Sequence, residues 1–403
     1  MLFIGIDWSR DKHDFAVLDP DGRLRESGQV PHAHEGLDQL AHVVAAHEPD
    51  PAQVRVVVEL HDGALLAWLM EQGYTVYGLN PKSADRARDC YRPGGTKDDA
   101  LDARILADWG RLHCATWRPL QAESPATLSL RSWVRLRARL VQDKTCACQR
   151  LRALLDEWAP TLSTLCDDFN RQWQQALLQR CPLPEDLAAW HLNGLRGWAR
   201  QGHLRAEALA RIDRTRSQPA IPIPSARRDA LRFEIRLLAE EIARLCQAIS
   251  HAEQALDRLL QTHPDAFIFK SLPVKGIATV ATLLAAFGED RGQDISWRER
   301  AARWGVAPVT VQSGKSRHVK RRCACDTTYN QAFLFFAFKT AFTPGCWAAG
   351  YYQAKRKAGV DHYSTLRALA LRWVKIIHRL WHDHLTYNEQ LHQTNRRLRG
   401  AAA

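Results

Sequence analysis

The sequence contains no run of 18 consecutive apolar residues, the length that a membrane-spanning helix requires. Its first residues, MLFIGIDWSRDKHD, reach charged side chains at once and lack the pattern of a signal peptide. The stretch FLFFAFKTAF is short and is interrupted by Lys339, so we interpret it as a buried helix. We therefore expect a cytoplasmic protein with no membrane partner.

Patterns typical of disulfide frameworks and of zinc sites are also missing. The chain has ten cysteines, four of which form the pairs Cys146/Cys148 and Cys323/Cys325. Cys-x-Cys is not the usual spacing of zinc ligands, and a disulfide framework is not typical of a long cytosolic chain. We interpret the thiols as reduced and mostly structural, and a zinc site built from the two pairs is the alternative.

Acidic residues are scarce towards the end of the chain. Residues 297–403 hold 19 Lys and Arg against 5 Asp and Glu, whereas residues 1–110 hold 11 against 19, within a net charge of +12. A length of 403 residues predicts two or three domains. An acidic front and a basic rear predict a carboxylate site joined to a surface that binds nucleic acid.

Short apolar runs near the start of the chain alternate with helical patterns. The expected strands are LFIGIDW, HDFAVLD, RLRESGQV, VRVVVEL and YTVYGLNP, and helices are expected at residues 35–47 and 63–72 and after the last strand. This alternation predicts an α/β domain with a mixed sheet covered by helices. Asp7 and Glu59 fall at or near strand ends, where open α/β sheets place their sites.

A pair of carboxylates begins the next helix. In GGTKDDALDARILADWG, Asp99 and Asp102 are three residues apart, so both lie on one helix face. The helix dipole alone would favour acidic residues here. Together with Asp7 and Glu59, the pair predicts a site for divalent cations, because crowded carboxylates repel each other and a cation relieves that cost. Asp98 also shares a face with Asp102 and is the alternative to Asp99.

The middle of the chain has a helical pattern. Residues 125–160 interleave apolar positions with arginines, and a solvated helix face is one interpretation of that charge. The other interpretation is contact with RNA, for which the candidates are the clustered Arg131, Arg135, Arg137 and Arg139.

A heptad pattern follows the PAIPIPS segment. Apolar residues repeat at spacings of four and three from Leu231 to Leu259, which is about four heptads. This pattern predicts a coiled-coil helix through which the protein self-associates. A long helix packed on a neighbour in the same chain is the alternative.

Five stretches, taken in order, resemble the DEDD transposases of bacterial insertion sequences, a family related to the Piv-type DNA invertases. They are GIDWSRDKH, VVVEL…GLNP, TKDDALDARILADWG, LPVKGIATVATLLAAFG and WGVAPVTVQSGKSRHVKRR. The resemblance covers both ends of the chain. It implies a RuvC-like, ribonuclease-H-type α/β domain at residues 1–120 and a mostly α C-terminal transposase domain at 263–403. The helical pattern and the heptads predict a helical coiled-coil domain between them, at 121–262.

The same resemblance implies an active site in two parts. The metal-binding tetrad, with two Mg²⁺ ions, would consist of Asp7, Glu59, Asp99 and Asp102. The nucleophile that forms a covalent Ser–DNA intermediate would be Ser313. The basic residues that surround it, and that could stabilise charge on a phosphate, are Lys315, Arg317, Lys320, Arg321 and Arg322.

Members of that family work with a structured non-coding RNA, the bridge RNA, which pairs with target and donor DNA. The resemblance therefore implies both nucleic acids as partners, a dimer that pairs into a tetramer on DNA, and a bacterial protein associated with the nucleoid when it acts. One rival hypothesis is a RuvC-like, two-metal nuclease that cuts branched DNA and needs no serine. A second rival is a nucleic-acid-binding protein without catalytic activity.

Overall fold

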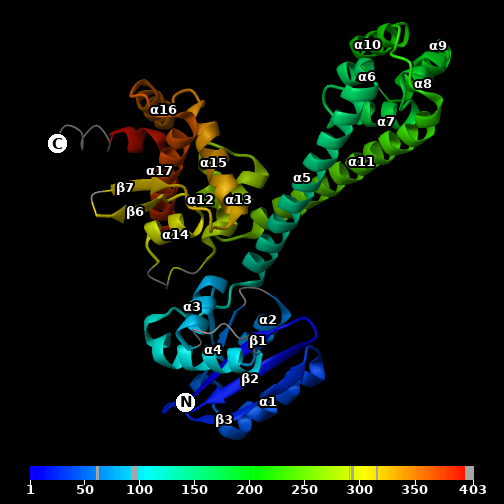
Figure 1. Ribbon diagram of the computed structural model, residues 1–403. Coiled ribbons are helices and arrows are strands. Elements are labelled where there is room, and N and C mark those ends of the chain that lie inside the picture. The colour runs from blue at the N-terminus through cyan, green and yellow to red at the C-terminus, as the bar shows by residue number, and fades with distance from the viewer. Residues whose placement is uncertain are drawn as a thin grey trace. The chain divides into compact units, whose positions relative to one another are not determined.

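Figure 1 shows a computed structural model of the chain, which describes residues 1–59, 63–91, 99–202, 204–289, 291, 295–314 and 316–394. The chain divides into two compact units, Met1–Ala122 and Glu123–Ala403. Over the described ranges, none of the helices is both long enough and apolar enough to cross a membrane. The division into three domains stays a prediction.

The first unit is built on a five-stranded sheet in the order β3-β2-β1-β4-β5. Its central strand β1 (Leu2–Trp8) pairs antiparallel with β2 (Lys12–Leu18), which pairs antiparallel with β3 (Leu24–Pro31). On the other side, β4 (Val54–Val58) runs parallel to β1, and β5 (Thr75–Gly78) runs parallel to β4. This mixed sheet is of the ribonuclease-H type, and the predicted α/β fold of the first domain is confirmed.

Helices cover the sheet on both faces. One face packs against α1 (His34–His47) and α2 (Ala64–Glu71), and the other packs against α4 (Asp99–His113). Side chains of β1 alternate between the two cores, with Ile4 and Ile6 in the first and Phe3 in the second, because successive strand residues point to opposite faces. The remaining elements of this unit are η1 (Pro51–Gln53), α3 (Pro81–Tyr91) and η2 (Cys114–Thr116).

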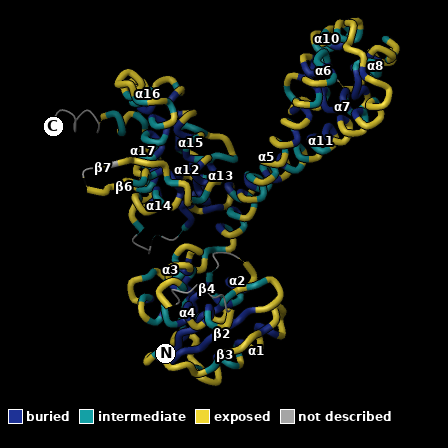
Figure 2. The backbone as a smooth tube through the Cα atoms, in the orientation of Figure 1, coloured by how far each residue is buried: buried dark blue, intermediate teal, exposed yellow. Residues whose placement is uncertain are grey.

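The second unit is mostly helical and is organised around an antiparallel pair of long helices, α5 (Pro125–Trp158) and α11 (Ser225–Thr262). At one end of this pair the connecting helices are α6 (Pro160–Leu165), α7 (Gln172–Arg180), α8 (Pro184–Ala189), α9 (Leu192–Gln201) and α10 (Ala206–Arg216). At the other end lie α12 (Ala266–Lys270), α13 (Ile277–Phe287), α14 (Trp297–Arg303), β6 (Val309–Ser313), β7 (Ser316–Lys320), α15 (Thr327–Ala341), α16 (Trp347–Lys357) and α17 (His362–His382). Each end has its own buried core, which Figure 2 shows in dark blue.

The heptad positions of α11 pack against α5 and its connecting helices in the same chain. Ile235, Ile242 and Leu256 are fully buried there, and Leu238 is 6% exposed. The structure thus uses the heptad face for packing within the chain, which was the alternative interpretation. Self-association stays a prediction and requires a surface that this packing leaves uncovered.

The stretch FLFFAFKTAF falls on α15 and at its end, and the expectation that it is a buried helix is wrong for one face. Phe333 and Phe336 are fully buried, whereas Phe335, Phe338 and Phe342 are exposed. A run of aromatic residues carries no periodicity that separates the two faces. The sequence therefore could not show which rings face the core.

Candidate active site

The ends of two neighbouring strands bring Asp7 and Glu59 together. β1 and β4 are parallel, with Ile6 opposite Val58, so Asp7 and Glu59 each follow at the same edge of the sheet. Asp7 lies two residues after Gly5, and residues two apart in a strand share a face. Both carboxylates therefore lie on the face of the sheet that α4 covers.

Gly5 allows α4 to approach the sheet closely. A Cβ atom at this position would lie 2.0 Å from the carbonyl oxygen of Ala103 and 2.4 Å from the backbone nitrogen of Ala107. The first turn of α4 consequently lies beside the end of β1. That turn carries Asp102, which is buried, and Asp99, which is exposed.

Arg88 on α3 joins two of the four carboxylates. Its Nη2 lies 2.8 Å from Oε2 of Glu59, and its Nε lies 2.9 Å from Oδ2 of Asp102. The Asp102 side chain is only 4% exposed, so the guanidinium supplies the positive charge that this carboxylate needs inside the protein. A third contact, 3.0 Å from Nη1 to Asp85, holds Arg88 from its own helix.

Asp7, one of the two tetrad members that Arg88 does not pair with, shows the effect of this crowding. Burial raises the pKa of Asp7 to about 6, and repulsion from Asp102, Asp99 and Glu59 adds to it, whereas Arg88 opposes the rise. The four predicted tetrad residues therefore interact electrostatically as one cluster. A single guanidinium does not neutralise all of their charge.

The chemistry of this cluster fits a hard divalent cation. Mg²⁺ is bound in proteins through carboxylate oxygens, and the tetrad offers only such donors. As the side chains stand, the described residues contain no group of three or more His, Cys, Asp or Glu arranged to hold a metal ion. Arg88 bridges two of the carboxylates with its guanidinium, and in this arrangement it neutralises charge that a cation would otherwise compensate.

The sequence analysis missed Arg88 because it did not predict α3. The signal was Asn80-Pro81: the Asn80 side chain accepts a hydrogen bond from the backbone of Ser83 at 3.0 Å, and proline is favoured in the first helical turn. A further buried carboxylate, Asp14, lies opposite Asp7 on β2 but is engaged within the fold. The Asp14 carboxylate accepts hydrogen bonds from Nε2 of Gln29 at 3.1 and 3.2 Å. Asp98 lies outside the described residues.

Ser313 lies in the second unit, on a two-stranded hairpin that protrudes from the helices (Figure 1). Ser313 ends β6, is exposed, and lies opposite Ser316, the first residue of β7. Gly314 in the turn has φ +53°, a conformation that favours glycine. Ser316 is hydrogen-bonded to Nε2 of His318 at 2.8 Å, on the face that Ser313 shares.

The predicted basic contacts near Ser313 have different surroundings. Lys320 and Arg321 are exposed, and Arg322 is half-buried. Lys315 and the side chain of Arg317 lie outside the described residues. In the structure, this hairpin is therefore a basic, solvent-exposed ribbon.

Of the arginines proposed for RNA, Arg131 is held inside the unit. Its Nε donates to the carbonyl oxygen of Ala285 at 2.9 Å, and its guanidinium pairs with Glu123. Arg135 and Arg139 are exposed and lie one helical turn apart on α5. Arg137 is half-buried and paired with Glu253, so the outer part of the predicted RNA contact reduces to Arg135 and Arg139.

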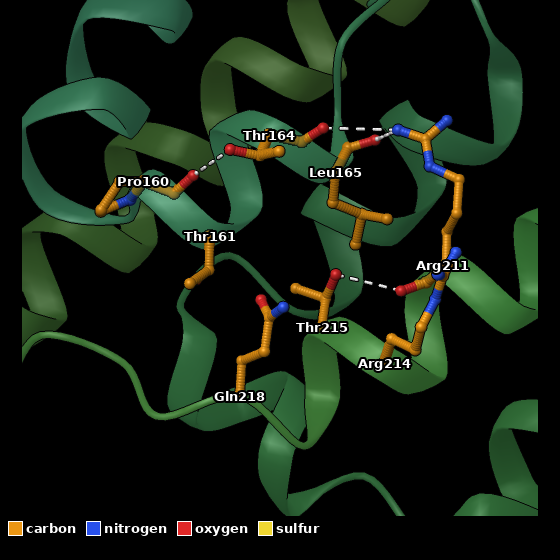
Figure 3. Close-up of a pocket in the computed structure, with 8 residues that line it drawn as sticks. All are labelled: Pro160, Thr161, Thr164, Leu165, Arg211, Arg214, Thr215 and Gln218. Carbon is orange, nitrogen blue, oxygen red and sulfur yellow. Dashed lines mark hydrogen bonds between the residues drawn. The ribbon is translucent and has the colours of Figure 1, made fainter.

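A cavity of about 530 Å³ between α6 and α10 contains none of the predicted site residues (Figure 3). Arg211 on its wall donates to the carbonyl oxygens of Leu165 at 3.0 Å and Thr164 at 3.3 Å. These bonds satisfy the last turn of α6, so this arginine serves the local fold.

The two Cys-x-Cys pairs lie far apart in sequence, on α5 and in the loop after β7, and all ten thiols are free.

Two family models match the chain. One, for the DEDD group of IS110 elements and described as a transposase, matches residues 4–160, which include the tetrad. The other, described as the IS116/IS110/IS902 family of transposases, matches residues 266–353, which include Ser313.

Two of three curated relatives extend along nearly the whole chain. The mini-circle putative transposase for IS117 of Streptomyces coelicolor is 28% identical over 401 residues, which cover 96% of each chain. The uncharacterized 42 kDa protein of insertion element IS900 from Mycobacterium paratuberculosis is 26% identical over 403 residues, 96% of this chain and 97% of its own. Putative transposase y4uE of Sinorhizobium fredii is 30% identical over 188 residues, 46% of this chain and 52% of its own.

Proposed function

Because the chain is a transposase of the IS110/IS116/IS900 family, an enzyme of DNA transposition, we propose that it cuts and rejoins DNA through the joint action of its two units. The observation that carries this proposal is the cluster of carboxylates around Arg88 at the edge of the first sheet. A partly buried, mutually repelling set of oxygen donors is costly unless it serves a cation or a reaction.

We assign the binding of divalent metal, two Mg²⁺ ions in the full site, to Asp7, Glu59, Asp99 and Asp102. When bound, the metal would supply Lewis-acid stabilisation of the charge on a phosphodiester. The protein's own contribution is to hold these carboxylates on rigid elements, two strand ends and one helix start. Arg88 limits their repulsion before the metal binds.

We assign the nucleophile to Ser313. In this step a bond forms between Ser313 Oγ and phosphorus while a bond from phosphorus to a backbone oxygen of DNA breaks. The serine proton passes to a base, and the leaving oxygen takes up a proton to become a hydroxyl. His318 and Ser316 lie on the same face of the hairpin as Ser313, which makes that imidazole a candidate base.

The bridge RNA and the oligomer belong to the same proposal. Exposed basic residues on the hairpin and on α5, among them Lys320, Arg321 and Arg139, support contact with nucleic acid phosphates. A dimer that pairs into a tetramer on DNA would allow the tetrad of one subunit to serve the serine of another. The cellular setting is the bacterial nucleoid.

A two-metal nuclease in which water attacks the phosphodiester is the second candidate function. One observation favours it: strand ends, the start of α4 and Arg88 hold the tetrad in place within the first unit, whereas Ser313 is on an exposed strand. This candidate requires no covalent intermediate and no RNA.

A strand-transfer assay in Mg²⁺, with and without the cognate RNA, separates these functions. The proposal predicts joined DNA products only when both Mg²⁺ and RNA are present. Cleavage without joining, independent of RNA, would instead identify the nuclease. Binding without either reaction would identify a nucleic-acid-binding protein without catalytic activity.

A further inference from the structure

The outer face of α15 is aromatic where a surface helix is ordinarily polar. Phe335, Phe338 and Phe342 recur at spacings of three and four residues, so they lie along one stripe of the helix. Their exposed fractions are 47%, 40% and 58%. The opposite face of α15, with Phe333 and Phe336, already supplies the core of this part of the unit.

The stripe continues onto two further helices as one connected set of rings. Ring centroids lie 5.1 Å apart for Phe338 and Phe342 and 5.3 Å apart for Phe342 and Tyr352 of α16. From Tyr352 the contacts pass to His362 at 5.8 Å and then to Tyr363 at 5.1 Å, both at the start of α17. We call these five connected rings, together with Phe335 on the same stripe, the aromatic patch; its members are Phe335, Phe338, Phe342, Tyr352, His362 and Tyr363.

The patch is held in place rather than loosely exposed. The hydroxyl of Tyr352 and Nδ1 of His362 are hydrogen-bonded at 2.7 Å, which joins α16 to α17. Tyr363 next to this bond is 69% exposed. Neighbouring aromatic rings with this much exposed surface mark a candidate binding site.

Positive charge borders the aromatic patch. Nζ of Lys339 lies 5.4 Å from the ring centroid of Phe335, and Lys355, Arg356 and Lys357 form the last turn of α16, one turn beyond Tyr352. The adjacent acidic residue, Asp361, caps α17 by accepting from the backbone of Ser364 at 2.9 Å. The patch therefore combines apolar ring faces with a cationic rim.

This combination selects among the possible occupants. A second copy of this chain would cover the rings but would bring another basic surface against Lys339 and the end of α16, since residues 297–403 hold 19 Lys and Arg against 5 Asp and Glu. An unpaired nucleic acid strand supplies both partners, because its bases stack on aromatic side chains and its phosphates pair with cations. In a duplex the base faces are already stacked on each other.

We propose that the aromatic patch binds an unpaired stretch of DNA, with bases stacked on the exposed rings and phosphates at Lys339 and the end of α16. The DNA component rests on the family's action on DNA, and strand exchange necessarily exposes unpaired bases. The inference does not depend on the tetrad or on Ser313. It assigns to the outer face of α15 a role in holding DNA after the strands have separated.

The test is the binding of a fluorescent, unstructured DNA strand of about 20 nucleotides to the full-length protein in EDTA, so that no metal-dependent cleavage occurs. Phe338→Ala and Phe342→Ala should each weaken binding about tenfold, the effect typical of losing one stacked base. Phe342→Trp should retain the wild-type affinity. Phe267→Ala is the matched control, because Phe267 on α12 is 46% exposed and lies outside the patch.

A salt series separates stacking from charge. Lys339→Gln should reduce the slope of log affinity against log salt by about 0.7, the value for one phosphate contact on a single strand. The two alanine variants should keep the wild-type slope, and thermal unfolding should show that all variants are folded. Asp102→Asn and Ser313→Ala should bind this strand like the wild type, so loss of their activity would leave the inference intact.

Several results would overturn the proposal. Unchanged affinity of both alanine variants, or an equal loss in Phe267→Ala, would show that the rings do not bind bases. An equal loss for duplex DNA would exclude stacking as the cause. If the two alanine variants lost binding to RNA of the same sequence but bound DNA normally, RNA would be the occupant. If they showed a lower mass in light scattering and an unchanged DNA affinity, the occupant would be a second copy of the chain.

Discussion

The two halves of the candidate active site differ in how they are built. Asp102 is 4% exposed, paired with Arg88, and fixed by a helix that packs on a glycine of the central strand. Ser313 ends a hairpin strand whose residues are nearly all exposed, and a Cβ added at the neighbouring Gly314 would meet nothing within 4 Å. The carboxylate site is preorganised by its own unit, whereas the serine is presented to solvent.

This difference suggests a division of work. A preorganised cluster of charge lowers a barrier without reorganising, which suits the stabilisation of a reacting phosphate. A serine hydroxyl is a weak nucleophile at its free pKa and needs activation from groups around it. For Ser313 on the exposed hairpin, we propose that this activation comes from His318 on the same face or from metal bound by the tetrad.

Loss of a tetrad carboxylate should reduce DNA cleavage more than any other change, because this half of the candidate site is preorganised. Asp102→Asn keeps the shape of the side chain but removes the charge that contributes to metal binding, and it should lower DNA cleavage by at least about 10²-fold in Mg²⁺. Asp14→Asn is the control, since Asp14 is also buried on this face but is engaged by Gln29. Rates from a cleavage time course would decide, and equal rates for the two variants would remove Asp102 from the site.

Arg88 offers a sharper test of how the cluster is neutralised. Arg88→Met leaves Glu59 and Asp102 without the guanidinium that pairs with them. The free energy of unfolding of the metal-free protein should therefore fall by on the order of 2–3 kcal/mol. This is less than the roughly 3–5 kcal/mol for breaking a fully buried pair, because the Arg88 side chain is 28% exposed. Mn²⁺ should bind more tightly to this variant, because the guanidinium no longer competes for these carboxylates.

Thermal unfolding in EDTA and calorimetric Mn²⁺ titration measure the two effects. Arg86→Met is the matched control, because Arg86 is exposed on the same helix. Weaker Mn²⁺ binding in Arg88→Met would mean that Arg88 positions the carboxylates for the metal instead of competing with it.

Self-association through α11 is tested on the face of this helix that α5 does not cover. Phe233 and Leu237 are 69% and 45% exposed and lie one turn apart, so replacing both with lysine should give a smaller species in light scattering without unfolding the chain. Leu238→Lys, by contrast, places a charge in the core and should destabilise the unit by several kcal/mol. If the double variant keeps its mass, any oligomer uses a different surface.

The smallest effect concerns a buried histidine in the first unit. Burial, together with the neighbouring His32, lowers the pKa of His13 to about 4, although Asp14 opposes the shift. An unfolded His13 titrates near pH 6.5, so the unfolded state binds more protons between these values and stability should fall, by on the order of 1–3 kcal/mol, as pH drops from 6.5 towards 4.

His13→Gln should flatten this part of the pH dependence relative to the wild type, as measured by urea unfolding at each pH. His34→Gln, at a side chain that is 81% exposed, is the control and should leave the wild-type slope. A wild-type slope in His13→Gln as well would assign the acid sensitivity to other groups.

The sequence predicted the first unit better than the second for a physical reason. Strand runs such as LFIGIDW and VRVVVEL, and the i, i+3 pair Asp99 and Asp102, carry periodicities that local pattern reveals. Contacts between these elements leave no periodic pattern in the sequence. Arg88, for example, contacts Glu59, which is 29 residues away. The closeness of Gly5 to α4 likewise depends on packing across the sheet.

In the second unit, the heptad pattern of α11 is equally compatible with packing on a partner chain and with packing on a neighbouring helix of the same chain. In the structure, α5 covers this heptad face. The aromatic run on α15 similarly gave no sign of which face is covered. In both cases the choice is made by contacts between segments more than 50 residues apart, such as that between Arg137 and Glu253.

The most direct test of the account is covalent trapping on a nicked DNA substrate in Mg²⁺, analysed on denaturing gels and by mass spectrometry of the linked peptide. We expect a protein–DNA adduct at Ser313 in the wild type and in Ser316→Ala, and no adduct in Ser313→Ala or Asp102→Asn. An adduct that survives Ser313→Ala would contradict the assignment of the serine. Efficient cleavage by Ser313→Ala without any adduct would replace the whole account with a metal-dependent nuclease that uses water.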